Sequence, residues 1–193
     1  MVVFDATMLS LMLRPNSRAP LDSATGLPVE HADLRIADLV RRLQRSKTVI
    51  IVPTPALSEI LIKSGAGGPG ILQTIQRSPA FRIEGFDIRA AVELAQMTNE
   101  TASGADKRAA IAAPWAKIKF DRQIVAIARV HRATHIYTDD LQLIGFASLN
   151  DIECVKLADL PLPASAMQGE LPLFDGDGEP VENPENDPET PQG

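Results

Sequence analysis

Acidic side chains stand at several points of this sequence where a strand ends or a helix begins. Asp5 follows the apolar run VVF, and Asp139 and Asp140 follow HIYT. Asp121 precedes the apolar segment IVAIARV, and Glu59 lies inside another, ALSEILI. Because ligands bind at the carboxyl ends of strands in open α/β sheets, acids at those ends are candidate site residues. Taken singly, each acid could also be only a helix cap.

Such acids, if gathered in one place, would suit a divalent cation. Neighbouring carboxylates repel one another unless a cation neutralises them, and oxygen ligands without His or Cys favour Mg²⁺ or Mn²⁺. Glu59 fits this interpretation, because a carboxylate in an apolar helix either reaches an exposed rim or faces a cation. A site of this kind polarises a phosphodiester bond and activates water, as in metal-dependent nucleases. The three histidines are scattered, and the single Cys154 excludes an internal disulfide.

Strands and helices must alternate along the chain to bring these acids together. Continuous apolar or β-branched runs predict strands, and 3.6-residue spacing of apolar residues predicts helices. The alternation predicts an α/β fold with a central parallel sheet of about five strands. Asp121 is expected in the first turn of its helix, where the helix dipole favours negative charge. The expected strands are 2–4, 48–52, 81–86, 135–138 and 152–155, and the expected helices are 6–13, 32–46, 55–64, 71–76, 88–101, one opening at 121, and 141–149.

Four segments, in the same order along the chain, resemble the PIN-domain nucleases, especially the VapC-type ribonuclease toxins. They read FDATML, PTPALSEIL, FDRQIVAIA and IYTDD, and the resemblance extends from about Val2 to Val155. It implies a three-layer α/β/α sandwich, Mg²⁺-dependent cleavage of RNA, frequent homodimers and often a paired antitoxin protein. The acids that it selects as catalytic and metal-holding are Asp5, Glu59, Asp121 and Asp140. The T-x-D pattern of the last segment favours Asp140 over Asp139, which remains a further candidate ligand.

Neighbouring polar and basic residues complete the predicted site. Thr7 and Thr138 are candidates for hydroxyl groups that orient the carboxylates, although each could equally be an ordinary cap or strand residue. Basic side chains should position the RNA backbone. The candidates nearest to the acids in the sequence are Arg14, Lys63, Lys117, Lys119 and Arg122.

The charge distribution divides the chain into a domain, 1–160, and a tail, 161–193. The tail holds 8 acids, no Lys or Arg, and 7 of the 15 prolines, which is typical of disorder. Outside the tail, 19 basic residues face 17 acids, so the net charge of −6 does not argue against a nucleic-acid substrate. The tail and the long connection 14–31 depart from compact toxins, and they question the toxin role more than the nuclease chemistry.

Two other functions compete with the nuclease interpretation. A haloacid-dehalogenase-type phosphatase also begins with a strand ending in Asp, but its second Asp would fall at Thr7, and it has no use for Glu59. A PIN-like binding or docking module with little catalytic activity is the non-enzymatic alternative. The start, MVVFDATML, has neither a basic n-region nor a long apolar run, so we expect a cytoplasmic protein without a membrane span.

Overall fold

The computed structural model describes residues 1–14, 17–102, 115–163 and 166, and within them five parallel strands form one sheet. The strands are β1 (Val2–Phe4), β2 (Ile50–Pro53), β3 (Phe81–Glu84), β4 (His135–Tyr137) and β5 (Glu153–Val155). Their spatial order is β3-β2-β1-β4-β5, so the first strand of the chain lies at the centre. Val2 of β1 pairs with Ile50 on one side and with His135 on the other.

The central strands are apolar because helices cover both faces of the sheet. Every residue of β1 and β2 is buried, as expected for parallel strands between two helical layers. The edge strands β3 and β5 are only partly buried. The core therefore runs through β1, β2 and β4 and thins out toward both edges.

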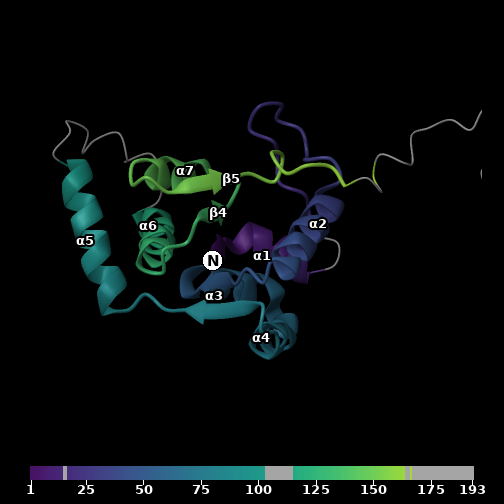
Figure 1. Cartoon of the computed structure of the whole chain (residues 1–193), viewed down its shortest axis with the longest axis horizontal. Helices are drawn as coiled ribbons and strands as arrows, with labels where there is room; N and C mark the ends of the chain where they lie inside the picture. The colour runs from purple at the N-terminus through teal and green to yellow at the C-terminus, as the bar shows by residue number, and fades with distance from the viewer. Residues whose placement is uncertain (15–16, 103–114, 164–165, 167–193) are drawn as a thin grey trace, which may run out of the picture.

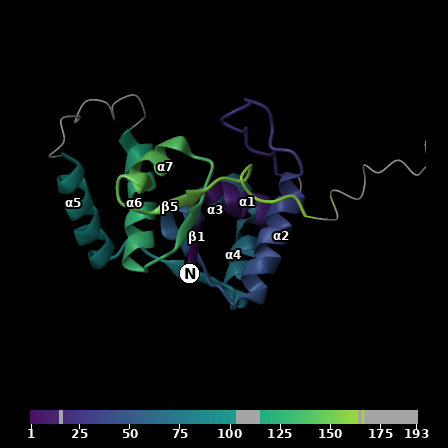
Figure 2. The same cartoon turned by 45° about the horizontal axis from the view of Figure 1, so that its top comes forward.

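The helices lie in two layers on opposite sides of the sheet (Figures 1 and 2). Helices α1, α2 and α4 cover one side, and α6 covers the other, with α5 outside it. The fold is thus the three-layer α/β/α sandwich with a parallel sheet that the sequence predicted. The helices are α1 (Ala6–Leu13), α2 (Ala32–Arg45), α3 (Thr54–Ser64), α4 (Gly68–Arg77), α5 (Ile88–Ala102), α6 (Trp115–Val130) and α7 (Leu141–Ser148), with a short 3-10 turn, η1 (Gly65–Gly67), before α4.

Most expected element positions match the structure to within a few residues, but the start of α6 does not. This helix begins at Trp115, so Asp121 lies in its second turn rather than its first. The prediction that Asp121 opens the helix was wrong, because the segment 115–120, WAKIKF, looks like part of a polar connection yet is helical. The dipole of the first turn therefore does not act on Asp121 as expected.

The connection 14–31 and the chain after β5 pack against each other. An isolated bridge joins Leu21 to Pro28, and the Lys156 amino group lies 2.9 Å from the Ser23 hydroxyl oxygen. Beyond β5, Leu157 and Leu160 are buried, and Arg35 of α2 donates to the carbonyl oxygens of Ala158 and Leu160. We call residues 156–163 the C-terminal strap.

The prediction of disorder for the tail falls mostly outside the described residues. None of the described helices is long and apolar enough to cross a membrane.

Candidate active site at the carboxyl ends of β1 and β4

Asp5 is the most buried of the predicted site acids. It directly follows β1 and caps α1, where its Oδ1 accepts from the backbone N–H of Met8 at 2.8 Å. Its side chain is shielded because Val2–Phe4 and α1 both belong to the core, which leaves the residue only 5% exposed. A local rule, an aspartate capping a helix after a buried strand, thus fixes a carboxylate inside the protein.

Thr138 links Asp5 to the acid pair that follows β4. Its hydroxyl donates to Asp5 Oδ2 at 2.6 Å and accepts from the backbone N–H of Asp140 at 3.0 Å. Asp140 in turn caps α7, and its Oδ1 accepts from the N–H groups of Gln142 and Leu143. One fully buried hydroxyl therefore holds the ends of two neighbouring strands together, in the role expected of a residue that orients carboxylates.

The environment of Asp5 opposes its negative charge. Burial raises the pKa of Asp5 to about 7, and the hydrogen bonds from Thr138 and from the Met8 N–H offset part of that rise. The nearby charge of Asp139 raises the pKa further, and the backbone N–H of Thr7 lowers it slightly. Thr7 therefore acts on Asp5 through its backbone. A buried carboxyl with a raised pKa is a frequent mark of functional sites, because a bound cation would restore its charged form.

Asp121 adds a second buried carboxyl from α6. The residue is 9% exposed and precedes Ile124, Val125, Ala126 and Ile127, which are all buried in the core. Because α6 contributes this apolar face, the helix is held tightly against the sheet. The side chain of Asp121 is therefore kept from free solvent, unlike most aspartates.

Glu59 lies in a different environment. Helix α3 buries Pro55, Ala56, Leu57 and Ile60, so Glu59 stands on its outer face with a side chain that is 55% exposed. Its Oε1 lies 2.6 Å from the amino group of Lys63, one helical turn later. Of the two alternatives expected for Glu59, the structure shows the exposed position, with Lys63 as its ion-pair partner. The role of Glu59 as a metal ligand stays a prediction.

Asp139 is hydrogen-bonded to the C-terminal strap. Its Oδ1 accepts from the backbone N–H of Leu157 at 3.1 Å, and burial raises its pKa. Its buried Oδ2 has no hydrogen-bond partner among the described residues. Asp139 thus attaches the strap to the end of β4, a contact that no local sequence pattern indicated.

The predicted RNA-positioning residues are scattered. Arg14 ends α1 and lines a hollow with Ser17 and His31, and Lys63 pairs with Glu59. The guanidinium of Arg122 stacks over the ring of Phe146, 5.0 Å from its centroid, which holds it between α6 and α7. The backbones of Lys117 and Lys119 belong to α6, whereas their side chains lie outside the described part of the chain.

The oxygen atoms of the candidate site are of the type that Mg²⁺ binds, but their present spacing is not that of a metal site. The carboxylates of Asp5 and Asp140 and the hydroxyl of Thr138 lie at the ends of β1 and β4, and oxygen atoms are the ligands that Mg²⁺ prefers. Among the described residues, however, no three His, Cys, Asp or Glu side chains lie close enough together to hold an ion. Asp5 and Asp140 are joined through Thr138, while Lys63 already neutralises Glu59.

Comparison with solved structures identifies the fold. A chain of the DNA-bound VapBC2 complex of Rickettsia felis is 12% identical, with a TM-score of 0.51, and the match covers 81% of this chain and 98% of that one. DNA-bound VapBC of Salmonella typhimurium is 13% identical, covering 81% and 97%, with a TM-score of 0.49. The Mycobacterium tuberculosis toxin VapC20, which cleaves the Sarcin-Ricin loop, is 14% identical, covering 75% and 94%, with a TM-score of 0.47. No protein-family model and no curated protein sequence matches the chain.

The strand order and the R. felis likeness together define the class of fold. Within the described residues, the chain has a five-stranded parallel sheet flanked by helices, with the buried Asp5 after β1 and the half-buried Asp139 and Asp140 after β4. More specifically, its fold is similar to that of the matched chain of the R. felis VapBC2 complex, and the predicted α/β fold with a central parallel sheet is confirmed.

Proposed function

We propose that this protein is a Mg²⁺- or Mn²⁺-dependent endoribonuclease. The observation that carries the proposal is the Asp5–Thr138–Asp140 link at the carboxyl ends of β1 and β4. The chain leaves β1 toward β2 and leaves β4 toward β5, in opposite directions, so these two ends form the topological switch point of the sheet. Ligands of open α/β sheets bind at that crevice.

In this proposal four carboxylates bind the metal ion from different elements. Asp5 and Asp140 hold the ion from the strand ends, Asp121 contributes from α6, and Glu59 joins after it leaves Lys63. When bound, the ion would supply charge stabilisation at the phosphate and lower the pKa of water. Thr138 keeps Asp5 oriented, because its hydroxyl donates to Asp5 Oδ2. Asp140 is held by the backbone amides at the start of α7, which limits its rotation.

The proposal extends to the partners of this chain. The similar R. felis structure is a VapBC2 complex bound to promoter DNA. An antitoxin that pairs with this chain and controls its activity is therefore part of the proposal, as are an RNA substrate and a homodimer. The long connection and the acidic tail leave room for a nuclease that acts without an antitoxin.

The test is cleavage of a labelled mixed RNA pool by the purified full chain. We expect cutting with Mg²⁺ or Mn²⁺, none with EDTA, and a loss of at least a hundredfold in Asp5→Asn and in Asp121→Asn. Asp151→Asn is the matched control, because Asp151 is exposed and its φ of 55° is one that Asn tolerates well. Cutting that survives EDTA or both active-site substitutions would overturn the proposal.

A docking module is the second candidate, and the Glu59–Lys63 ion pair favours it. With Glu59 engaged, the described residues form no metal site of three side chains. If the protein is a docking module, the wild-type chain and the Asp121→Asn variant should bind RNA or a protein partner with equal affinity. Neither should show heat of Mg²⁺ binding in calorimetry. Calorimetry on both variants therefore separates a nuclease with a narrow substrate from a module without a metal.

A further inference from the structure

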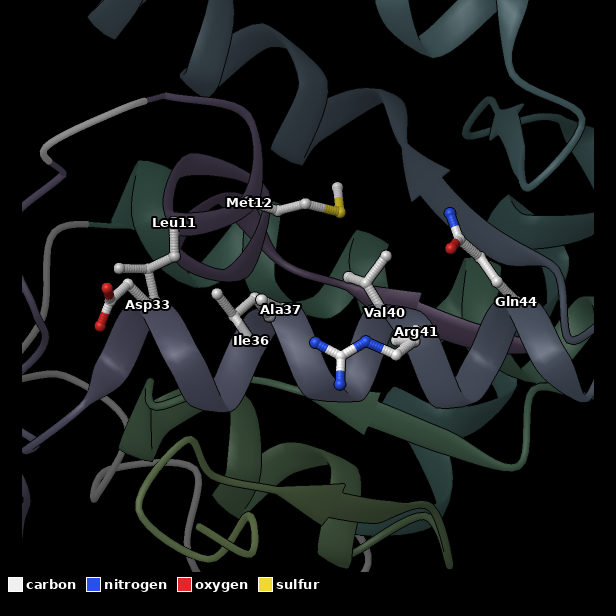
Figure 3. Close-up of a pocket in the computed structure, with 8 residues that line it drawn as sticks. All are labelled: Leu11, Met12, Asp33, Ile36, Ala37, Val40, Arg41 and Gln44. Carbon is white, nitrogen blue, oxygen red and sulfur yellow. The ribbon is translucent and has the colours of Figure 1, made fainter. Parts of the chain in front are cut away.

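A shallow apolar hollow lies between α1 and α2, and the proposed nuclease chemistry makes no use of it. Its volume is about 370 Å³. Figure 3 shows Leu11 and Met12 of α1 facing the side chains of α2, among them Ile36 and Val40, across this space. Leu11, Met12 and Val40 pack against the core and stay partly exposed, whereas Ile36 is buried. The hollow can therefore accept a few apolar side chains.

The charged side chains of α2 differ between the two ends of the helix that borders the hollow. Asp33 lies in the first turn of the helix, whereas Arg41, Arg42 and Arg45 lie in its second half. Asp38 is shared by two of these arginines, Arg41 at 3.2 Å and Arg42 at 3.0 Å. Among these arginines Arg41 lines the hollow, and the exposed Arg45 follows one turn later, so basic side chains stand at this end of α2.

The chain itself leaves the domain next to this helix. Leu157 and Leu160 of the C-terminal strap are buried, and the strap is bonded to Arg35 of α2 through two carbonyl oxygens. Residues beyond the strap therefore start their path beside α2. Leu171 comes eleven positions after Leu160, and an extended chain of that length reaches roughly 35 Å. Helix α2 with its 14 residues is about 21 Å long.

One segment of the tail has the composition that the hollow requires. Residues 170–175 read ELPLFD, with three large apolar side chains in four positions, and the acids Asp175, Asp177 and Glu179 follow closely. Pro172 restricts the backbone of the segment, so less conformational entropy is lost when it becomes ordered. We propose that residues 170–175 of the same chain bind in the hollow between α1 and α2.

The direction of the bound segment follows from the charges. Leu171 would enter near Leu11 and Asp33, and Phe174 would lie near Val40. The acids after Phe174 would then reach the end of α2 that carries Arg41 and Arg45. A tether of this length gives an effective concentration on the order of millimolar, so even a weak contact is occupied. Any partner protein that uses this face must first displace the tail.

Disulfide trapping in the full chain tests the contact without relying on nuclease activity. Gly176→Cys places a thiol just after the segment, and Gln44→Cys places one at the basic end of the hollow. The matched control pairs Gly176→Cys with Gln96→Cys, an exposed helical glutamine on α5, which lies on the other side of the sheet from α2 (Figures 1 and 2). Cys154 is replaced by Ala in every variant.

We expect the Gln44→Cys pair to form an intramolecular disulfide in at least tenfold higher yield than the Gln96→Cys pair. Adding Leu173→Asp and Phe174→Asp should reduce that yield to the control level, because charged side chains cannot enter an apolar hollow. Equal yields at both sites, or a disulfide that persists after the two Asp substitutions, would overturn the proposal. A disulfide found only between two chains, and more abundant at higher concentration, would overturn it too, since the occupant would be a second copy.

Discussion

At the scale of single residues, the site rests on a hydroxyl between two acids. Thr138 is fully buried, and its Oγ1 uses both its donor and its acceptor capacity, one for Asp5 and the other for the N–H of Asp140. Removing a buried hydroxyl leaves two polar groups without a partner, which costs more than the hydrogen bonds themselves contribute. The Thr138 hydroxyl should therefore matter for both stability and the ionisation of Asp5.

Thr138→Val tests this, because valine keeps the shape of threonine and removes its oxygen. We expect the free energy of unfolding to fall by about 1–3 kcal/mol, as for other buried polar groups left unsatisfied. Urea unfolding measures the change, and Thr74→Val on the exposed face of α4 serves as the control, with an effect below about 0.5 kcal/mol. If the two variants lose equal stability, the Asp5–Thr138 contact is not formed as described.

Asp5 should also make stability depend on pH in a defined direction. Its pKa is 3.8 in the unfolded reference and about 7 in the folded protein. Below both pKa values the Asp5 carboxyl is protonated in the folded and in the unfolded protein, so its burial does not lower the free energy of unfolding through ionisation. Between them the folded state keeps a proton that the unfolded state has lost, so stability falls as pH rises, by up to about 1.4 kcal/mol per pH unit. Above about pH 7 the penalty is constant.

Comparison with Asp5→Asn isolates this contribution, because asparagine does not titrate. We expect the stability difference between wild type and Asp5→Asn to change in favour of the variant from pH 4 to pH 7, and then to level off. Unfolding in EDTA at several pH values measures it, since a bound metal would mask the effect. A difference that stays flat over this range would show that Asp5 is not held in an environment that disfavours its charge.

At the scale of elements, α3 holds one of the proposed ligands in an ion pair of its own. Lys63→Ala removes the partner of Glu59 and should change stability by no more than about 0.5 kcal/mol, because both side chains are largely exposed. If Glu59 is a ligand, the same substitution should increase Mg²⁺ affinity in calorimetry. Lys47→Ala, at another exposed lysine, is the control and should change neither quantity. Unchanged affinity in Lys63→Ala would remove Glu59 from the proposed ligand set.

The strap offers a second test at this scale. Asp139→Ala removes the acceptor of the Leu157 N–H and should cost about 1–3 kcal/mol, whereas Asp139→Asn keeps an acceptor and removes a buried charge. We therefore expect Asp139→Asn to unfold at a higher denaturant concentration than Asp139→Ala. Hydrogen exchange at the Leu157 amide should accelerate only in Asp139→Ala. Equal exchange in both variants would mean that another group holds the strap.

The elements also show how far the sequence alone determines this protein. Apolar runs such as VVF and IIV predicted the central strands, and helix Ala6–Leu13 was predicted to the residue, because burial imposes these patterns locally. The start of α6 was not predictable, since its first turns are polar and basic. The contacts of Asp139 with Leu157 and of Lys156 with Ser23 join residues 18 and 133 positions apart, and no local pattern encodes them. The role of the four acids as ligands stays a prediction, and the sequence could not show that Lys63 forms an ion pair with Glu59.

At the scale of the whole molecule, burial decreases from the middle of the sheet to its edges. All residues of β1 and β2 are buried, whereas β3 and β5 are only partly covered. Local unfolding of a protein begins in the regions that have few buried contacts. The edges should therefore open while the centre stays closed. The acids after β1 and β4, which belong to the centre, would keep their arrangement during such openings.

Native-state hydrogen exchange tests this gradient. We expect the amides of Val3 and Ile51 to exchange only by global unfolding, so that their rates follow the unfolding equilibrium as urea is added. The amides of Arg82 and Val155, which face the neighbouring strand from the two edge strands, should exchange by smaller openings that depend weakly on urea. Tyr137 of β4 is the internal control, because its amide faces β1 and β4 lies inside the sheet although it comes late in the chain. If Tyr137 exchanges like Val155, the second half of the chain opens as one unit, and the link from Thr138 to Asp5 is too weak to couple β4 to β1.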